Sequence, residues 1–206
     1  MAFIILGILA LVAGIVLQKN EQVAPFAKVA RLVAVLLIIV GVLTKSVVQI
    51  NAGQIGVKTL FGKVQNDVLH SGLHFINPLM EVLSLDIKTQ NYTMSGVQDE
   101  GNRSADDAIR VLTADGLEVT IDLTVLYKLL PSEAPKLVRE TGEDYKDKIV
   151  RPLTRTKIRD NSVYYDAISL YSSKRDEFQQ RIFKSIEDDF KKRGLILEQL
   201  LVRNIT

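Results

Sequence analysis

The fold is decided by one stretch of sequence, Leu117-Glu118-Val119-Thr120-Ile121-Asp122-Leu123-Thr124-Val125-Leu126-Tyr127-Lys128-Leu129. Apolar residues occupy every second position from Leu117 to Leu129, and Leu126 alone breaks the alternation. A period of two is typical of a strand that buries one side and exposes the other, as in an antiparallel sheet. Seven inward side chains, at about 1.5–3 kcal/mol each, make this strand a large contributor to the stability of the fold.

The sequence before this strand predicts further β structure. Asp115-Gly116 separates the strand from the apolar stretch Ile109–Thr113, and this dipeptide suits a tight hairpin because both residues tolerate positive φ. The most polar stretch, Gly96–Asp107, is expected to be a mobile surface loop. Glycine and proline separate the other strand-forming stretches, which are Val47–Phe61, Val64–Leu69, a short strand before Pro78, and Glu81–Lys88.

The sequence after Pro131 predicts helices. We expect a short helix capped by Ser132, a second helix over 143–160 that starts or kinks at Pro152, and a third that begins with a capping box of Ser173 and Asp176. The third helix carries an apolar stripe of Phe178, Ile182, Phe183, Ile186 and Phe190 and stops at Gly194. Leu195–Ile205 returns to strand character. Residues 49–206 therefore predict an α+β fold with an antiparallel or mixed sheet, mainly β over 49–130 and helical over 131–206 with a closing strand.

Two apolar runs precede this domain. Ala2–Leu17 is uncharged, and the second run extends from Leu32 to Leu43, or to Val48 if Lys45 snorkels. As helices they reach roughly 25 Å each, just short of a hydrocarbon core of about 30 Å. With a polar connector over 18–31, residues 1–48 predict a helical hairpin that spans the membrane or re-enters it. A secretory signal peptide and two buried core helices are the alternatives.

Charge and composition argue against several functions. Residues 1–50 have a net charge of +3 and the whole chain has +2, so the remainder has −1, whereas nucleic acid requires a basic face. There is no cysteine, and His70 and His74 are separated by Gly72 in an extended stretch, which does not suit a metal site. Gly62-Lys63 lacks the spacing and the following Ser or Thr of a phosphate loop. We therefore expect no catalytic residue, cofactor or metal.

Two charged clusters are candidates for contacts between copies or with lipid. Arg151, Arg155 and Arg159 recur every four residues on one helix face, which suits docking to an acidic surface or to lipid phosphates. The alternative is a solvated face balanced by nearby aspartates. Glu187, Asp188 and Asp189 lie near the end of the third helix. We hypothesise that the arginine face of one copy docks against these acids of the next.

An ordered set of motifs resembles the SPFH or Band 7 domain of stomatins, prohibitins, flotillins and their bacterial relatives. The resemblance covers Gln49 to Thr206, and the Gly142-Glu143-Asp144-Tyr145 element and the closing strand look most like bacterial prohibitin-like proteins. The other motifs, in order, are Ile55-Gly56-Val57, Phe61-Gly62-Lys63-Val64, Gly72-Leu73-His74-Phe75-Ile76-Asn77-Pro78, Thr113-Ala114-Asp115-Gly116-Leu117, Ile149-Val150-Arg151-Pro152, Ile158-Arg159-Asp160, Leu170–Phe178 and Gly194–Glu198.

The resemblance implies a non-enzymatic membrane scaffold. Such proteins assemble with copies of themselves or with related SPFH subunits, organise lipid patches, and often associate with membrane-bound AAA proteases. This sequence has two apolar runs where prohibitins have one anchor, and it stops at Thr206, where the family pattern continues into a heptad helix. Either the chain is truncated or the walls of a cage are missing. The alternative is a membrane-tethered protein- or lipid-binding module that does not form large rings.

The distribution of positive charge predicts the side of the membrane. Lys19, Lys28 and Arg31 crowd the connector, whereas basic residues are sparser beyond the second run. The positive-inside rule then places the connector in the cytoplasm and the SPFH domain on the extracytoplasmic side of a bacterial inner membrane. A re-entrant hairpin reverses this assignment.

Overall fold

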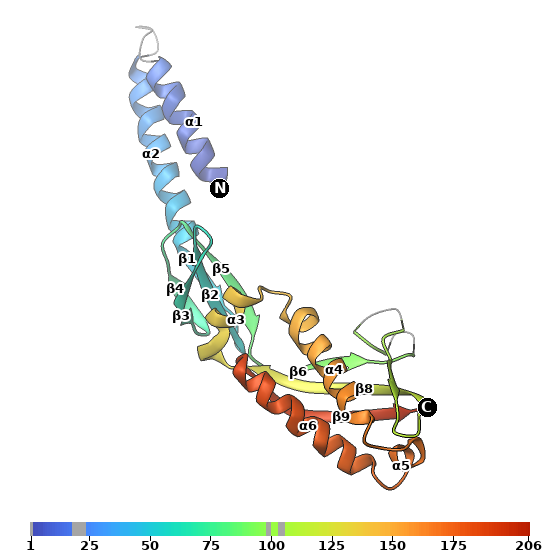
Figure 1. Cartoon of the computed structure of the whole chain (residues 1–206). Coiled ribbons are helices and arrows are strands. Elements are labelled where there is room, and N and C mark those ends of the chain that lie inside the picture. Colours follow the sequence, from blue (N-terminus) through green and yellow to red (C-terminus); the bar gives the residue numbers. More distant parts are fainter. Residues whose placement is uncertain (1, 18–23, 98–99, 103–105) are drawn as a thin grey trace.

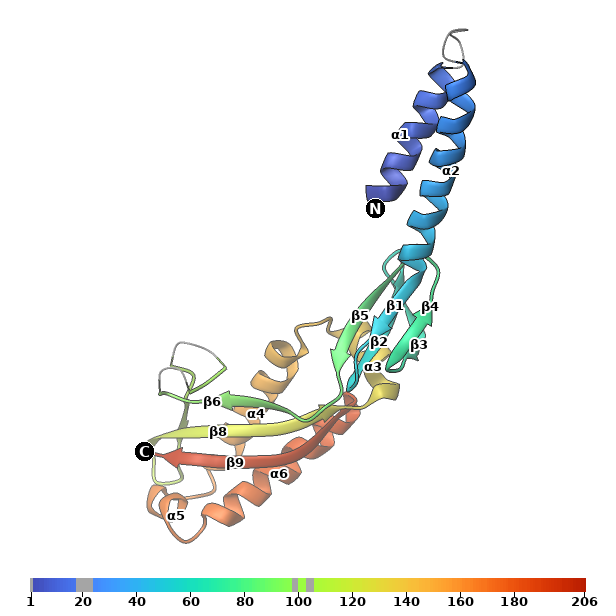
Figure 2. The same cartoon turned by 180° about the vertical axis from the view of Figure 1, so that it is seen from behind.

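The computed structural model of the chain describes residues 2–17, 24–97, 100–102 and 106–206. The molecule is elongated (Figure 1): two apolar helices lie at one end, a small β-rich unit follows, and a long sheet covered by helices forms the other end. Seen from behind, the long strands lie in front of the helices that cover them (Figure 2), so these helices occupy one face of the sheet.

The apolar helices are α1, Ala2–Leu17, and α2, Ala24–Ser46, and they lie side by side. They approach closely at Gly7, where an added Cβ would lie 2.6 Å from Cγ1 of Ile38. Arg31 Nη2 donates to the carbonyl oxygen of Gly14 in the last turn of α1, where cations are favoured. Residues 24–31, which the sequence assigned to the connector, are therefore helical, and the rest of the connector, 18–23, lies outside the described residues.

The extension of α2 changes its length relative to a membrane. With 23 residues at 1.5 Å per residue, α2 is about 35 Å long, rather than the roughly 25 Å inferred from the apolar run. Within the part of the chain that the structure describes, one segment, Lys28–Ser46, has the length and composition to cross a membrane; the apolar part of α1, Ile5–Val16, is shorter.

Two small antiparallel sheets begin where α2 ends. Strand β1, Val47–Ile50, follows Ser46 directly and pairs with β4, Gly72–Phe75. Strand β2, Gln54–Leu60, lies between β3, Lys63–Leu69, and β5, Met80–Asp86. The β2–β3 turn has left-handed φ at both central residues, Phe61 (48°) and Gly62 (80°), as in a type I′ turn.

The long sheet is built around β8, Glu118–Leu129, as the alternating sequence predicts. β8 pairs with β6, Gln90–Met94, and β7, Ile109–Leu112, along one edge and with β9, Leu195–Ile205, along the other. All of these pairs are antiparallel. The predicted α+β class is confirmed, and of the two sheet types considered the antiparallel one is present.

Burial along β8 follows the prediction except at its start. Six of the seven predicted inward residues are buried, whereas Leu117 is 54% exposed because it lies in the turn before the strand. The opposite side is not uniformly solvated. Asp122 is buried where it accepts a hydrogen bond from Gly96 N at 2.9 Å, and Thr124 is buried where its hydroxyl meets that of Thr93 at 2.9 Å.

The turn before β8 is longer than the predicted two-residue hairpin. Gly116 N donates to the carbonyl of Thr113, and Thr113 N donates to the carbonyl of Leu117, each at 3.0 Å. Gly116 has φ 77°, and Asp115 does not have positive φ. This pattern is a three-residue loop that ends in a left-handed glycine, the second common hairpin type.

The three predicted helical stretches are helical, but two predicted caps are absent, and a short helix over Ala167–Tyr171 was not predicted. Ser132 lies in a 3₁₀ turn, Pro131–Glu133, and α3, Ala134–Glu140, has no side-chain cap. A π-helical turn, Lys146–Val150, leads into α4, Arg151–Ser162, which carries Pro152 in its first turn as predicted. After α5, Ala167–Tyr171, helix α6, Arg175–Lys192, has Lys174 at its N-cap and lacks the predicted Ser173–Asp176 capping box.

The apolar stripe of α6 forms the core beneath β8 and β9. Phe178, Ile182, Ile186 and Phe190 are fully buried, and Phe183 is partly buried, as the helical spacing predicts. Gly194, with φ 77°, ends the helix, and β9 begins at Leu195 as predicted. Helices α4 and α6 thus cover one face of the long sheet and hold the charged clusters on a rigid frame.

Candidate functional site

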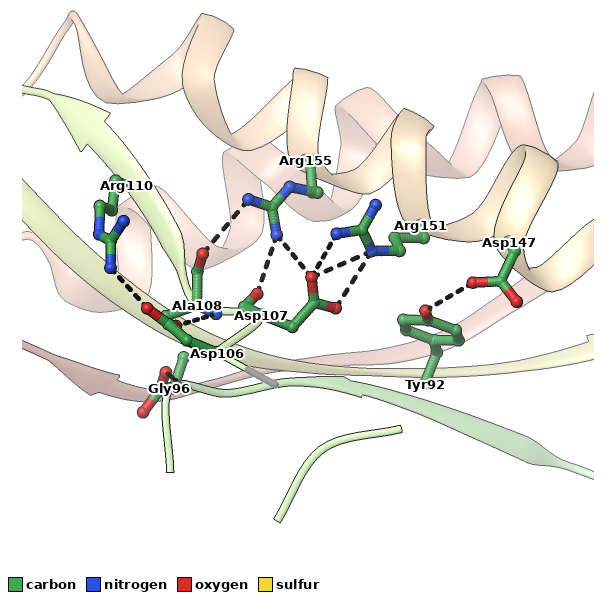
Figure 3. A network of polar contacts seen from close by, with 10 residues as sticks. Tyr92, Gly96, Asp106, Asp107, Ala108, Arg110, Asp147, Arg151 and Arg155 are labelled. Atoms are coloured by element: carbon green, nitrogen blue, oxygen red, sulfur yellow. Dashed lines mark hydrogen bonds and ion pairs between the residues drawn. The ribbon is translucent and has the colours of Figure 1, made fainter. Parts of the chain in front are cut away.

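Arg151 and Arg155 point from α4 toward Asp107 at the end of the polar loop (Figure 3). The Asp107 side chain is 2% exposed. Nε of Arg151 donates to both of its carboxylate oxygens at 3.1 Å. Nη1 of Arg155 donates to the Asp107 carbonyl at 2.8 Å and to its carboxylate at 3.1 Å, while Nη2 reaches the carbonyl of Ala108 at 3.3 Å.

This network fixes α4 to the start of β7. Burial lowers the pKa of Arg155, and the negative charge of Asp107 opposes that shift. Loss of one partner from a buried ion pair typically costs about 3–5 kcal/mol because the other charge is left unpaired. Asp107 ends the stretch that the sequence predicts to be a mobile surface loop, but it is buried, since the guanidinium groups of Arg151 and Arg155 on α4 both contact it.

The third arginine differs from the first two. Arg159 is exposed on α4, and no carboxylate among the described residues pairs with it. On α6, Asp189 is paired within the chain, with Lys157 Nζ at 2.9 Å and Lys192 Nζ at 3.5 Å. The hydrogen bond from Lys157 lowers the pKa of Asp189.

The other two acids of the candidate cluster on α6 are available for contacts. Glu187 and Asp188 are exposed and form no ion pair with any described residue. Of the six charges that the sequence nominated, Arg151, Arg155 and Asp189 are therefore occupied within the chain, and Arg159, Glu187 and Asp188 are free. Docking between copies through these charges stays a prediction.

The Gly142–Tyr145 motif lies against the long sheet. Tyr145 is buried, its hydroxyl accepts a hydrogen bond from Gln90 Nε2 at 3.0 Å, and its ring meets Tyr127 edge-on with centroids 6.4 Å apart. Burial raises the pKa of Tyr145. Tyr92 on β6 donates to Asp147 Oδ1 at 3.1 Å (Figure 3). The motif therefore joins the π-helical turn to β6.

A second surface lies where α2 enters the domain. Phe61, Phe75 and Leu79 are 84%, 76% and 61% exposed. Phe75 is the register partner of Val47, the first residue after α2, and Phe61 and Leu79 adjoin the paired residues Leu60 and Met80. The chain reverses after β1, so the β2–β3 turn returns toward α2 (Figures 1 and 2). We call Phe61, Phe75 and Leu79 the apolar rim.

The apolar rim is the feature that sequence reasoning missed. Large exposed apolar groups gathered in one place mark a contact with protein or membrane. The sequence does mark Phe61 as unusual. Asn, Asp or Gly is preferred before the glycine of a type I′ turn, and here an aromatic residue occupies that position. A bulky residue held at positive φ carries strain that is typical of functional positions.

The two histidines lie close to each other in the small β-rich unit. His70 follows β3 and His74 lies on β4, with Nε2 of His74 2.6 Å from the carbonyl oxygen of His70. Within the described part of the chain, no group of three histidine or carboxylate side chains is placed to hold a metal ion.

Comparisons with known proteins identify the family. The family model of the SPFH domain / Band 7 family matches residues 48–206. Prohibitin 1 of Drosophila melanogaster is 22% identical over 147 residues, which cover 71% of this chain and 48% of that protein. The chain thus spans about half the length of this curated relative. Because the family model covers the whole region after α2, the resemblance noted in the sequence is confirmed, and the chain belongs to the SPFH domain / Band 7 family.

Proposed function

We propose that this protein is a membrane-anchored scaffold of the prohibitin or stomatin type, which assembles on the membrane and organises lipid patches. Residues 1–48 form its anchor, with α1 and α2 inserted as a helical hairpin, and residues 49–206 form its SPFH domain. A membrane-associated scaffold role, rather than an enzymatic one, is general in this family.

The observation that carries this proposal is the continuity between α2 and the domain. Helix α2 ends at Ser46 and β1 starts at Val47, so no flexible linker separates the apolar helix from the sheet. Apolar side chains cover the outside of the helix pair; Leu9, Leu32 and Leu36, for example, are 62%, 69% and 55% exposed. Such a surface is unfavourable in water at about 25 cal/mol per Å² and carries no such cost in lipid.

The apolar rim supports the same arrangement. It lies at the end of the domain where α2 enters, so it meets the membrane surface when α2 is inserted. Exposed Phe and Leu side chains gain free energy when they leave water for an apolar environment. We infer that the domain lies against the membrane through the rim.

Assembly is the second part of the proposal. An anchor holds every copy in one plane and one orientation, so a contact too weak for association in solution can still form. Ring closure requires a heterologous interface between unlike faces. Arg159 on α4 and the pair Glu187 and Asp188 on α6 are the free charges of opposite sign that such an interface can use. At about 0.2–1 kcal/mol per exposed pair, this contact depends on the membrane and weakens in salt.

A second candidate is a membrane-tethered binding module that stays monomeric or forms small oligomers. The occupation of Arg151, Arg155 and Asp189 within the chain favours it, because only half of the nominated charges remain for contacts between copies. The mass of the particle extracted from membranes separates the two candidates, since a scaffold gives an assembly of many copies.

Carbonate extraction of membranes tests the anchor. The full chain is expected to stay in the pellet at alkaline pH, whereas a peripheral protein is released. Protease added to intact spheroplasts tests the side of the membrane; digestion of the SPFH domain agrees with the extracytoplasmic placement in a bacterial inner membrane, and protection contradicts it.

Regulation of a membrane-bound AAA protease is the most specific part of the proposal. It rests on the resemblance to the prohibitin branch. The test is co-purification of such a protease with the full chain from gently solubilised membranes, and its failure leaves the membrane-scaffold proposal intact.

A further inference from the structure

An open cavity of about 630 Å³ lies between the β2–β3 hairpin and α3. Gly62, Lys63, Gln65 and Asn66 line it from the hairpin, and Val138 and Arg139 line it from α3. None of the lining residues is acidic. The cavity begins at Gly62, which directly follows Phe61 of the apolar rim.

The chemistry of this cavity suits an anion. Lys63 and Arg139 are exposed, and neither is paired with a carboxylate among the described residues. Arg139 Nη2 donates to Asn66 Oδ1 at 2.6 Å, which holds the guanidinium beside the hairpin with its other N–H groups free to donate. Gln65 Nε2 donates to the carbonyl of Lys63 at 3.2 Å, and its amide is the second one among the residues that line the cavity. Arginine and lysine together are the residues that bind phosphate oxygens most strongly.

The position of the cavity relates it to the membrane, and this step rests on the proposed function. Lys63 pairs with Leu60 beside the rim, and Asn66 is three residues further along β3. At about 3.4 Å per residue, the cavity extends on the order of 10 Å away from the rim. The polar headgroup layer is about 5–8 Å thick on each side of a bilayer. A rim seated at the edge of the hydrocarbon thus brings Lys63 into this layer and Arg139 to its outer border.

We propose that this cavity binds the phosphate of an anionic phospholipid. Lys63 and Arg139 contact the phosphate oxygens, and the amides of Gln65 and Asn66 contact hydroxyl groups of the headgroup. The acyl chains lie beside Phe61 in the rim. The occupant is a membrane lipid rather than a soluble phosphate, because the cavity opens next to an apolar surface that a soluble anion does not use.

The test uses the full chain and the double variant Lys63→Gln, Arg139→Gln, reconstituted in vesicles of equal parts phosphatidylcholine and phosphatidylglycerol. Both are transferred to nanodiscs, and native mass spectrometry measures the ratio of phosphatidylglycerol to phosphatidylcholine that stays bound. Each removed cation is expected to lower this ratio roughly fivefold. The control Lys184→Gln, Arg193→Gln removes the same charges from exposed positions on and after α6 and leaves the ratio unchanged.

Three outcomes overturn the inference. An equal loss in the control variant means that the preference is general electrostatic attraction. Displacement of phosphatidylglycerol by millimolar glycerol phosphate assigns the cavity to a soluble phosphate. An unchanged ratio in the double variant, with that variant still in the carbonate pellet, contradicts the lipid site but not the membrane anchor. Release of the unmodified chain from the carbonate pellet contradicts the membrane anchor as well.

Discussion

Asp107 is the buried charge on which the contact between α4 and β7 depends. Two guanidinium groups and a carboxylate meet there, with the carboxylate almost fully withdrawn from water. Adjacent Asp106 has the same chemistry but is 48% exposed and pairs with Arg110. The sequence does not distinguish the two aspartates, because their burial is decided by α4, which is more than forty residues away.

Asp107→Asn is expected to lower the free energy of unfolding by about 3–5 kcal/mol, since Arg151 and Arg155 lose their countercharge while they stay partly buried. Chemical denaturation of the full chain in detergent measures the change. The matched control, Asp106→Asn, removes an exposed pair and is expected to cost about 0.2–1 kcal/mol. Equal effects of the two substitutions would mean that the buried network contributes nothing special.

Phe61 is the residue whose conformation conflicts with its chemistry. Its φ of 48° is unfavourable for an aromatic side chain, and its 84% exposure gives no packing in return. Phe61→Asn is therefore expected to raise the free energy of unfolding by about 1 kcal/mol. On vesicles, the same variant is expected to lose hydrogen-exchange protection at the β2–β3 turn. If the variant is stabilised but keeps its hydrogen-exchange protection on vesicles, Phe61 does not contact the membrane.

At the scale of elements, strands and helices with strong periodicity are predictable from the sequence. β8 and α6 bury the residues that their spacing selects, because each packs one face on the shared core. Helix caps and turn types are less predictable: Ser132 and Ser173 have the right chemistry, but Ser132 lies inside a 3₁₀ turn and Ser173 lies one residue before the N-cap of α6. The start of α2 was also missed, since charged Lys28 and Arg31 masked a helix that continues through them.

The turn before β8 offers a prediction at this scale. Gly116 has φ 77° and no atom within 4 Å of an added Cβ, so a side chain there meets backbone strain but no clash. Gly116→Val is expected to cost about 1 kcal/mol or more, measured by thermal unfolding of the full chain. Gly116→Asn fits the left-handed conformation and serves as control. If both variants melt as the unmodified chain does, the turn geometry is wrong.

At the scale of the whole molecule, the two apolar helices lie at one end (Figure 1), and the candidate contact charges that stay unpaired in the described part of the chain, Arg159, Glu187 and Asp188, lie on α4 and α6. The sequence identifies six charged residues as candidates for contacts between copies. In the folded chain, three of the six have no ion-pair partner among the described residues and are free for such contacts. Spacing along a helix shows which charges share a face, but only the tertiary structure shows which of them meet a partner from another element. The same reason applies to the apolar rim: the sequence marks Phe61 as unusual before glycine, but only the β-sheet register shows that Phe75 and Leu79 lie at the same end of the domain.

Charge reversal tests the proposed contact between copies. Arg159→Glu is expected to weaken the ladder of cross-linked oligomers in membranes, and adding Glu187→Lys and Asp188→Lys in the same chain is expected to restore it in part. Lys184→Glu, an exposed reversal elsewhere on α6, is the control. If neither change alters the ladder of cross-linked oligomers, Arg159 is an ordinary solvated residue and does not contact the next copy.

The central claim is that an anchored SPFH domain assembles in the membrane. Its most direct test is the number of copies of the full chain in each particle when membranes are extracted with a polymer that retains native lipid, measured by mass photometry. We expect particles of many copies at low salt that shift toward fewer copies as salt screens the contact between Arg159 and the acids of α6. Particles with a single copy at every protein density and salt concentration would contradict the scaffold and leave a membrane-tethered binding module.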